Sequence, residues 1–244
     1  MKAAFVSGAS TGVGKAMALK LLDQGFTVWS CSRTCAEELR DHPRFHWCEV
    51  DLGQPADIAA KLAGFLPAQT VKRLDVVFLN AGLFGLSPRP AVKMNLEAFQ
   101  QVLNTNLVAN KALLDILLQR YEVAQCLFSA SIAGVRLRAG TLSYAVSKAA
   151  LNALAQVYAL EHPGTFFAVI GLCNMRTRIM TDALAGDDLA LFPELAGLKA
   201  RVGEPDYLTE PEQRAAQLWR FYEAGFAGRM QSGRFIEIRE LLST

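Results

Sequence analysis

The sequence holds one pair of side chains whose spacing suits proton transfer. Tyr144 and Lys148 are four positions apart, and the apolar, Ala-rich run at 149–160 predicts a helix. Residues four apart share one face of a helix, so the phenol and the ammonium lie together. A neighbouring positive charge stabilises phenolate and lowers the pKa of a tyrosine, which favours a general acid or base acting on an alcohol or ketone oxygen. An ordinary surface pair can have the same spacing, so the elements predicted around the pair are needed to distinguish a catalytic pair from a surface pair.

A glycine turn lies between the first predicted strand, at 2–7, and the first predicted helix, which ends at Gly25. Glycines let the backbone approach a pyrophosphate, and a helix N-terminus offers free N–H groups and partial positive charge. The spacing Gly-x-x-x-Gly-x-Gly therefore favours a dinucleotide site, with a purely structural turn as the alternative. The expected cofactor contacts are Gly8, Ser10, Thr11, Gly12, Val13 and Gly14.

Arg33 follows the second predicted strand, at 26–31, where an NAD enzyme usually carries an acid for the ribose 2′-hydroxyl. An acid repels a 2′-phosphate, whereas a guanidinium pairs with it through two hydrogen bonds. The sequence therefore favours NADP(H), with NAD(H) as the alternative. The other interpretation is that Arg33 only covers the helix expected to begin near Ala36.

Strands and helices alternate along the rest of the chain. Further strands are predicted at 44–50, 74–79, 124–128, 166–172 and 233–238, and further helices at 57–65, 96–118, 144–160 and 211–224. This alternation predicts an α/β fold, a three-layer, doubly wound parallel sheet of the Rossmann type with about seven strands and helices on both faces. We expect a single domain over 1–244, with a lid or substrate loop around 175–207, which is rich in turn formers and leucine.

The composition describes a globular protein. Hydrophobic residues make up 52% of the 244 residues, which excludes a disordered chain. The net charge of +2 and the lack of a long basic run argue against nucleic acid as a partner. No apolar run is long enough to span a membrane, and the N-terminus lacks the pattern of a signal peptide. The 5 cysteines are scattered without metal-ligand spacing, so we expect reduced packing residues, no metal site and a cytoplasmic protein.

Asparagines stand at two positions where they are informative. Asn80-Ala81-Gly82 follow the fourth predicted strand, and a turn at the C-terminal end of a central strand is where an α/β sheet opens its ligand crevice. Asn104-Thr105-Asn106 interrupt the predicted helix at 96–118, which indicates a kink or a site because asparagine is a poor residue inside a helix. By itself, this interruption favours a structural role.

The combination resembles the short-chain dehydrogenase/reductase family, over essentially the whole chain and in its compact oxidoreductase branch. The order and the separations of the matching residues fit, including the thirteen positions from Ser131 to Tyr144. The matching residues are Gly8, Gly12, Gly14, Asp51, Asn80, Ala81, Gly82, Asn106, Ser131, Tyr144 and Lys148.

The resemblance implies a role for each catalytic residue. Tyr144 would protonate the substrate oxygen as hydride reaches the carbonyl carbon, or remove that proton in the reverse direction. Lys148 would lower the pKa of Tyr144 and bind the nicotinamide ribose. Ser131 would hold the carbonyl oxygen, and Asn106 would carry a water that links Lys148 to solvent.

The resemblance also implies further cofactor contacts. Asp51, with its neighbour Leu52, would hold the adenine, and Asn80 with Ala81 and Gly82 would shape the cofactor crevice. After the sixth strand, Met175 and Thr177 would meet the nicotinamide.

One departure from the family pattern stands after the sixth predicted strand. Leu172 and Cys173 occupy the place of the usual Pro-Gly turn, although Thr177 is in place. A residue with a side chain at position 173 would alter the approach of the nicotinamide or narrow the pocket. A nucleophilic role for Cys173 is disfavoured, because no histidine partner is evident.

The C-terminal third resembles the sepiapterin reductase and benzil reductase group, which reduces one ketone of a vicinal dicarbonyl. The similarity lies in residues 192–195, 209–212 and 232–237. Glu237 stands where sepiapterin reductases carry the Asp that anchors the pterin, one methylene longer. The alternative is a polar residue on an edge strand.

These observations together predict an NADPH-dependent carbonyl reductase that acts on a small-molecule ketone, with a vicinal dicarbonyl or a pterin side chain as the finer expectation. The alternatives are a secondary-alcohol dehydrogenase that uses the same site, and a non-catalytic NADP(H)-binding sensor. By resemblance to the family, we also expect a homodimer or homotetramer.

Overall fold

A single parallel sheet forms the centre of the protein, in a computed structural model that describes residues 1–67 and 70–243. The sheet has seven strands in the order β3-β2-β1-β4-β5-β6-β7. All pairings between neighbouring strands are parallel. The strands are β1 (Ala3–Ser7), β2 (Thr27–Ser32), β3 (Phe45–Glu49), β4 (Arg73–Leu79), β5 (Glu122–Ala130), β6 (Phe166–Gly171) and β7 (Phe235–Glu237). The predicted α/β fold is confirmed.

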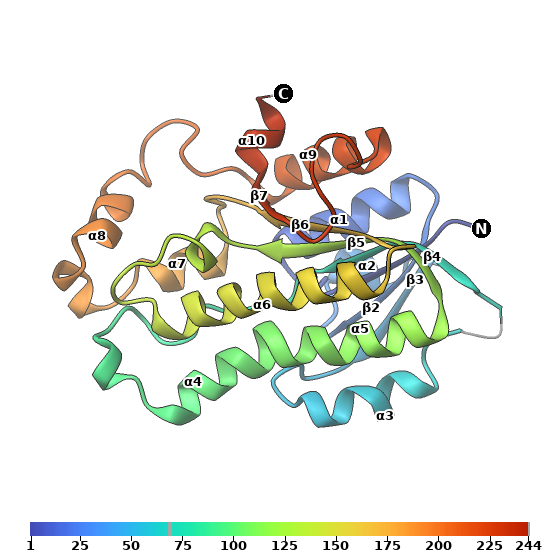
Figure 1. Ribbon diagram of the computed structural model, residues 1–244, viewed down its shortest axis with the longest axis horizontal. Coiled ribbons are helices and arrows are strands. Elements are labelled where there is room, and N and C mark those ends of the chain that lie inside the picture. The colour runs from blue at the N-terminus through green and yellow to red at the C-terminus, as the bar shows by residue number, and fades with distance from the viewer. Residues whose placement is uncertain (68–69, 244) are drawn as a thin grey trace.

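Helices cover both faces of the sheet. In Figure 1, α3, α5 and α6 lie on one face, and α1, α9 and α10 lie on the other. The helices are α1 (Gly12–Asp23), α2 (Glu37–Arg40), α3 (Ile58–Ala63), α4 (Leu96–Leu103), α5 (Ala109–Arg120), α6 (Leu142–Glu161), α7 (Arg178–Ala183), α8 (Pro193–Ala200), α9 (Pro211–Ala224) and α10 (Ile238–Leu242). None of the helices in the described ranges combines the length and apolar character needed to cross a bilayer.

The first strand shows why the sheet was recognisable from sequence. All five residues of β1 are buried. Ala4 and Val6 pack into the core with α1 and α9, and Ala3 and Phe5 pack into the second core with α3, α5 and α6. A strand that is buried on both faces has to be apolar at every position, and this gives a continuous hydrophobic run.

The helix predicted at 96–118 is interrupted where asparagines interrupt the sequence. A π-helical segment, Asn104–Val108, joins α4 to α5. Such segments widen one turn of a helix and occur frequently at functional sites. Asn106 lies in this segment and is fully buried.

Residues 175–207 contain helices that periodicity did not predict. This segment holds α7, a 3₁₀ turn at Asp187–Leu191 and α8, all too short to show a clear hydrophobic period. Leu189, Phe192 and Leu195 form a small core of their own. Figure 1 shows α7 and α8 beyond one end of the sheet, away from the N-terminus.

The C-terminal strand is shorter than predicted. It covers only Phe235–Glu237, and α10 begins at Ile238. Glu237 accepts from the backbone of Glu240 while the side chain of Glu240 accepts from the backbone of Glu237, which is a capping box. This capping box starts a helix where the sequence suggested one more strand residue.

Candidate active site

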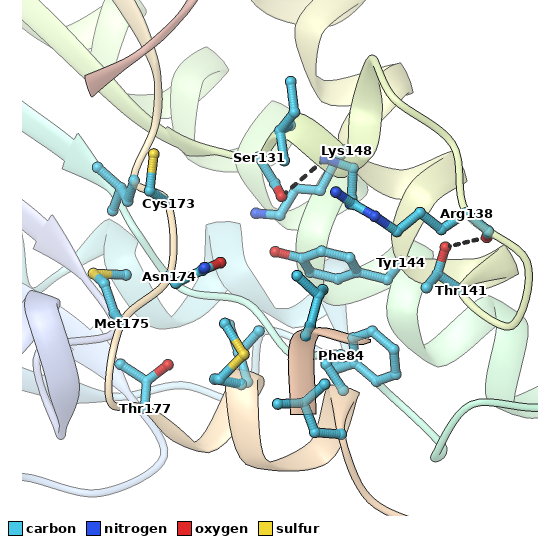
Figure 2. A pocket seen from close by; sticks show the side chains of 18 of the residues that line it. Phe84, Ser131, Arg138, Thr141, Tyr144, Lys148, Cys173, Asn174, Met175 and Thr177 are labelled. Atoms are coloured by element: carbon cyan, nitrogen blue, oxygen red, sulfur yellow. Dashed lines mark hydrogen bonds between the residues drawn. The ribbon is translucent and has the colours of Figure 1, made fainter. Parts of the chain in front are cut away.

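A cavity of about 320 Å³ lies at the carboxyl ends of β5 and β6. Ser131 follows β5, Tyr144 and Lys148 come from α6, and Leu172 and Cys173 follow β6; all five side chains line the cavity. Residues of α7 and α8 close another side of it. Figure 2 shows Tyr144 in the middle of the pocket with Ser131 and Lys148 beside it.

Lys148 is held in place by the end of β5. Its Nζ donates to the carbonyl oxygen of Ser129 at 2.7 Å and lies 5.7 Å from the centroid of the Tyr144 ring. The side chain of Lys148 is buried. The ammonium is therefore fixed beside the phenol, as the spacing of the two residues predicted.

Ser131 opens the short 3₁₀ helix Ile132–Gly134. Its Oγ accepts the backbone N–H of Ala133 at 3.2 Å. A Cβ on Gly134 would lie 2.6 Å from the carbonyl carbon of Lys148, so glycine lets this turn pack directly against α6. The close packing places Ser131 near Tyr144, and the sequence analysis had not identified Gly134.

The electrostatics of the phenol differ from the expectation. Burial raises the pKa of Tyr144, while hydrogen bonding with Ser131 lowers it. Burial also lowers the pKa of Lys148 to about 8. The pKa of Tyr144 in the protein alone is therefore raised and not lowered towards neutrality, because desolvation outweighs the hydrogen bond with Ser131. That Lys148 lowers this pKa stays a prediction.

Asn106 joins the loop after β4 to the catalytic helix. Its Nδ2 donates to Leu83 O at 2.9 Å and to Ser147 Oγ at 3.0 Å, and its Oδ1 accepts from Leu83 N at 2.9 Å. The backbone oxygen of Asn106 accepts from Asn110 Nδ2 at 2.7 Å. A water on Asn106 would therefore have to use a second lone pair of one of these oxygens. The water relay to Lys148 stays a prediction.

Phe84 and Ser147 belong to the site although the sequence gave no signal for them. The Phe84 ring is buried in the cavity wall, with its centroid 5.3 Å from that of Tyr144. Ser147 Oγ donates to Tyr144 O at 2.7 Å, so the hydrogen bond from Asn106 to Ser147 also fixes the turn of α6 that carries Tyr144. A buried phenylalanine and a helical serine look like ordinary packing residues in a sequence, and their role depends on the fold.

The glycine turn fits a dinucleotide. Gly8 and Gly12 have positive φ angles of 75° and 58°, and a Cβ on Gly14 would lie 2.2 Å from Gly8 O. Helix α1 begins at Gly12, and the N-cap Thr11 makes no side-chain capping hydrogen bond. The first N–H groups of α1 therefore remain available to an acceptor such as a phosphate.

The turn faces the loop after β6. A Cβ on Gly12 would lie 3.6 Å from Thr177 Cγ2. Thr177 is the N-cap residue of α7 but makes no side-chain capping hydrogen bond, and Met175 forms an isolated β-bridge with Thr209. Both Met175 and Thr177 line the cavity. Thr177 therefore lies next to both the glycine turn and the cavity, and the predicted pyrophosphate and nicotinamide contacts stay a prediction.

Asn80, Ala81 and Gly82 lie between the glycine turn and the catalytic side chains. Asn80 Nδ2 donates to Gly8 O at 3.3 Å, and a Cβ on Gly8 would lie 2.9 Å from Ala81 Cα. A Cβ on Gly82 would lie 3.7 Å from Lys148 Nζ. This loop lies where the sequence placed it, at the carboxyl end of β4.

Arg33 and Asp51 lie at the ends of neighbouring strands. Arg33 is exposed after β2, and no carboxylate in the described ranges pairs with its guanidinium. Asp51 is exposed two residues after β3, and its Oδ1 accepts from Gly53 N at 2.9 Å. Leu52 is buried beside it. Arg33 is thus available to a ligand, and Asp51 keeps a second carboxylate oxygen for one.

Cys173 adopts the backbone conformation that a glycine would favour. Its φ is 60°, in the left-handed region. The thiol lies 3.2 Å from Arg239 Nε and 3.5 Å from Glu237 Oε1. Burial raises the pKa of the Cys173 thiol, which disfavours the nucleophilic thiolate. The changed turn therefore keeps the chain path, and its side chain adds a thiol to the cavity wall.

Glu237 lines the same cavity as the catalytic residues. It ends the edge strand β7, and its carboxylate accepts the backbone N–H of Glu240 and the Cys173 thiol. Arg239 Nη2 lies 3.7 Å from it. The two interpretations of Glu237, as an edge-strand residue and as a pocket residue, are both compatible with its position, and most of its acceptor capacity is already used.

Metal ligands do not gather in the part of the chain that the structure describes, since it has no group of three or more His, Cys, Asp or Glu side chains that could hold a metal ion. The five cysteines, Cys31, Cys35, Cys48, Cys126 and Cys173, are free thiols.

Comparison with known proteins gives matches over most of the chain. The family model described as short chain dehydrogenase matches residues 2–185. The 1-deoxy-11-beta-hydroxypentalenate dehydrogenase of Streptomyces arenae is 29% identical over 174 residues, which is 67% of this chain and 61% of that protein. The rhamnolipids biosynthesis 3-oxoacyl-(acyl-carrier-protein) reductase of Pseudomonas aeruginosa is 28% identical over 250 residues, 96% of this chain and 93% of that protein.

Solved structures share the fold. The crystal structure of the KRED1-Pglu enzyme superposes with a TM-score of 0.83 at 21% identity, over 97% of this chain and 100% of that one. An alcohol dehydrogenase from the archaeon Thermococcus sibiricus, complexed with 5-hydroxy-NADP, gives a TM-score of 0.75 at 18% identity over 97% and 95%. The names of the relatives agree with the predicted enzyme class, an oxidoreductase acting on CH–OH or C=O groups.

Proposed function

We propose that this chain, which belongs to the short-chain dehydrogenase family, is an NADPH-dependent carbonyl reductase. The observation that carries the proposal is the meeting of Ser131, Tyr144 and Lys148 in one cavity. Thr177 lines this cavity and also approaches the glycine turn at Gly12, so a nucleotide bound at the turn would extend past Thr177 towards the phenol.

The catalytic residues divide the work on the carbonyl oxygen. When bound, a reduced nicotinamide supplies a hydride to the carbonyl carbon. The Tyr144 phenol then gives its proton to the oxygen, so that a ketone becomes a secondary alcohol. Ser131 hydrogen-bonds the same oxygen and holds it at the phenol. Lys148 holds a positive charge that stabilises the phenolate left on Tyr144, and this charge matters more in a dry cavity than in water.

The preference for NADPH is part of the proposal and rests on Arg33. Its guanidinium is exposed beside the crevice and has no ion-pair partner in the described ranges, so a 2′-phosphate would be its natural acceptor. NAD(H) remains the alternative. A nicotinamide cofactor also agrees with the 5-hydroxy-NADP in the alcohol dehydrogenase of similar fold.

The finer substrate is a vicinal dicarbonyl or a pterin side chain. This choice follows from the resemblance of the C-terminal third to sepiapterin and benzil reductases and from the place of Glu237 in the cavity wall. Its carboxylate has room for one further donor, such as a ring N–H.

Two alternatives are weaker. Alcohol oxidation uses the same residues in reverse, and the supply of reduced or oxidised cofactor decides the direction. A non-catalytic NADP(H) sensor was suggested by the changed turn at Leu172-Cys173. Because Cys173 keeps a left-handed conformation, this turn gives no reason to expect a distorted site.

The proposal is tested by the loss of NADPH absorbance with a panel of diketones, sepiapterin and simple ketones. Tyr144→Phe keeps the ring and removes the proton, so we expect the rate with the best ketone to fall about 100- to 10,000-fold. Calorimetry should show NADPH binding within a few-fold of the native protein. A Tyr144→Phe protein that keeps the native rate would show that Tyr144 is not the acid. A native protein that reduces none of these carbonyl compounds would contradict the proposed reductase activity.

The cofactor preference has a separate test. Arg33→Ala should raise the KM for NADPH about tenfold or more and leave the KM for NADH within about twofold, because only NADPH carries the 2′-phosphate. Arg120→Ala, an exposed arginine at the end of α5, is the control and should change neither value. Equal effects of Arg33→Ala on both cofactors would overturn the assignment.

A further inference from the structure

Basic side chains dominate the charge around the substrate cavity. One charged residue of its lining is acidic, Glu237, and five are basic, namely Arg136, Arg138, Lys148, Arg201 and Arg239. Lys148 belongs to the catalytic group. The four arginines have no part in the reaction proposed above, so their place in the cavity wall needs another explanation.

Arg138 has the most buried of the paired guanidinium groups in the wall. Its side chain is only 10% exposed, while its ion-pair partner Glu194 is 64% exposed. Arg138 Nε lies 3.0 Å from Glu194 Oε2 in an ion pair, but the pair does not have the geometry of a hydrogen bond. Burial lowers the pKa of Arg138, and the Glu194 carboxylate only partly opposes this effect. A buried guanidinium whose one carboxylate partner is poorly aligned is incompletely satisfied, so the position suits a further acceptor brought by a ligand.

Tyr207 provides a second unsatisfied donor in the same cavity. Its hydroxyl oxygen is buried and has no hydrogen-bond partner among the described residues. The guanidinium of Arg201 stacks on its ring, 4.4 Å from the centroid. Arg138 and Arg239 line the same cavity as this hydroxyl. The wall therefore combines three arginines with one buried hydroxyl donor.

Two of the three carboxylates that pair with these arginines lie outside the cavity. Glu194 and Glu204, the partners of Arg138 and Arg201, have side chains that are 64% and 50% exposed. Neither of them lines the cavity. Glu237 does, but its carboxylate is already shared between Arg239, the Cys173 thiol and the backbone of Glu240. The lining of the pocket therefore carries more positive than negative charge.

Arg138 is set apart from the cofactor crevice. Figure 2 shows its side chain reaching over Tyr144, with Met175 and Thr177 on the opposite side of the pocket. Thr177 is the residue that approaches the glycine turn. The phosphates of a nucleotide on that turn would thus lie on the far side of Tyr144 from Arg138, and the free donors face substrate space.

We infer that the natural substrate is a carbonyl compound that carries an oxyanion, and that Arg138 and Tyr207 bind this oxyanion while Tyr144 meets the carbonyl. Arg201 and Arg239 add to the attraction from the two sides of Tyr207. A carboxylate matches the guanidinium fork with two parallel oxygens, and a sulfonate offers the same oxygen chemistry. The apolar wall formed by Phe84, Ile132, Leu184, Leu195 and Leu198 suits the body of an acyl or aryl compound. This inference rests on the proposed function.

The test compares charged ketones with their neutral counterparts. Phenylglyoxylate and 4-acetylbenzoate place a carboxylate at two distances from the ketone, and each is assayed beside its methyl ester. A third charged ketone, 4-acetylbenzenesulfonate, distinguishes carboxylate from sulfonate. We expect at least one charged ketone to exceed its neutral partner about tenfold or more in kcat/KM.

Substitution of Arg138 gives the sharper result. In Arg138→Met, the ratio of kcat/KM for the charged ketone to that for its ester should fall about 10- to 100-fold, and Arg138→Lys should restore part of it. Arg73→Met is the matched control, because Arg73 is also paired with carboxylates but lies at the start of β4. A merely structural defect in Arg138→Met would lower the rates with the charged ketone and with its ester together and leave their ratio unchanged, and that result would overturn the inference. A native protein that prefers the esters would overturn it as well.

A binding measurement separates this inference from the proposed function. Calorimetric titration of the NADP⁺-saturated protein with 4-acetylbenzoate and with its methyl ester requires no turnover. Tighter binding of the acid that is lost in Arg138→Met supports the oxyanion site even if no carbonyl is reduced, a result that would sink only the reductase proposal. Equal binding of acid and ester, with reduction of neutral ketones intact, would remove the oxyanion site and leave the reductase standing.

Discussion

At the scale of single residues, Lys148 carries a charge at a position that disfavours it. The side chain is buried, and burial lowers its pKa from 10.5 to about 8. Because the folded state binds the proton more weakly than the unfolded state, charged Lys148 destabilises the fold at neutral pH. The residue is therefore explained by the chemistry next to Tyr144 and not by stability.

The first prediction concerns the destabilisation of the fold by the buried charge of Lys148. Lys148→Met should raise the free energy of unfolding at pH 7 by about 1 to 2 kcal/mol. This is less than the full pKa shift implies, because the hydrogen bond to Ser129 is lost. The same substitution should lower the reductase rate at least about 100-fold. The gain should be full below pH 8 and shrink as the pH rises from 8 to 10.5, because Lys148 becomes neutral in both states only above pH 10.5.

Urea unfolding across this pH range checks the prediction. The control is Lys111→Met, which removes an exposed lysine paired with Asp115 on α5 and should give no gain at any pH. A Lys148→Met protein that is less stable than the native protein at pH 7 would show that the hydrogen bond to Ser129 outweighs the desolvation of the charge.

At the scale of elements, the π-helical segment Asn104–Val108 holds the loop after β4 against α6. Asn106 does this with three hydrogen bonds, two to the backbone of Leu83 and one to Ser147. Because Ser147 in turn bonds to the backbone of Tyr144, the cofactor loop and the catalytic helix are fixed by one buried amide.

The second prediction follows from this connection. Asn106→Ala leaves a buried N–H and a buried C=O of Leu83 without partners, so we expect the free energy of unfolding to fall by about 2 to 4 kcal/mol. Asn104→Ala is the matched control in the same segment; it removes one bond of 3.3 Å to Gly53 O and should cost less than about 1 kcal/mol. Urea denaturation at 25 °C measures both, and equal losses would contradict the central role of Asn106.

The elements also show what the sequence could and could not predict. Strands such as β1 were predictable because burial on both faces requires a continuous apolar run. The helices α7 and α8 were missed because six and eight residues are too few for a period to show. The end of β7 was misplaced because the Glu237–Glu240 capping box, a helix-start signal, was not recognised.

The site divides in the same way. The meeting of Tyr144, Lys148 and Ser131 in one cavity was predictable, because the proposed chemistry requires those residue types at those separations. The direction of the Tyr144 pKa was not, because it depends on burial, which the spacing does not contain. The arginines around Tyr207 were missed because they come from separate segments and meet only in the folded chain.

At the scale of the whole molecule, an apolar surface suggests that the protein is an oligomer. Exposed apolar side chains occur along α4, the π-helical segment and α6, namely Leu96, Val108, Val146, Val157 and Leu160. Leu160 is 80% exposed and Val157 51%. In the homodimer or homotetramer expected from the family resemblance, we expect this face to be an interface between copies of the chain.

The third prediction tests this assembly. Light scattering coupled to size exclusion should give the native protein a mass of two or four times 26.6 kDa. The double variant Val157→Glu with Leu160→Glu should shift toward 26.6 kDa, because a like-charged patch opposes association. Leu191→Glu, which alters an exposed leucine of the 3₁₀ turn between α7 and α8, should keep the native mass. A native monomer would contradict the proposed oligomer.

The strand order has a consequence for how the chain is made. Within this sheet β1 is the first strand to be synthesised, yet it lies in the interior between β2 and β4, and its Ala4 pairs with Val76. At a synthesis rate of about 5–20 residues per second, one side of this apolar strand waits roughly 4 to 14 seconds for its neighbour. During that interval the nascent chain exposes an unpaired hydrophobic edge, which makes it a substrate for chaperones and prone to aggregate.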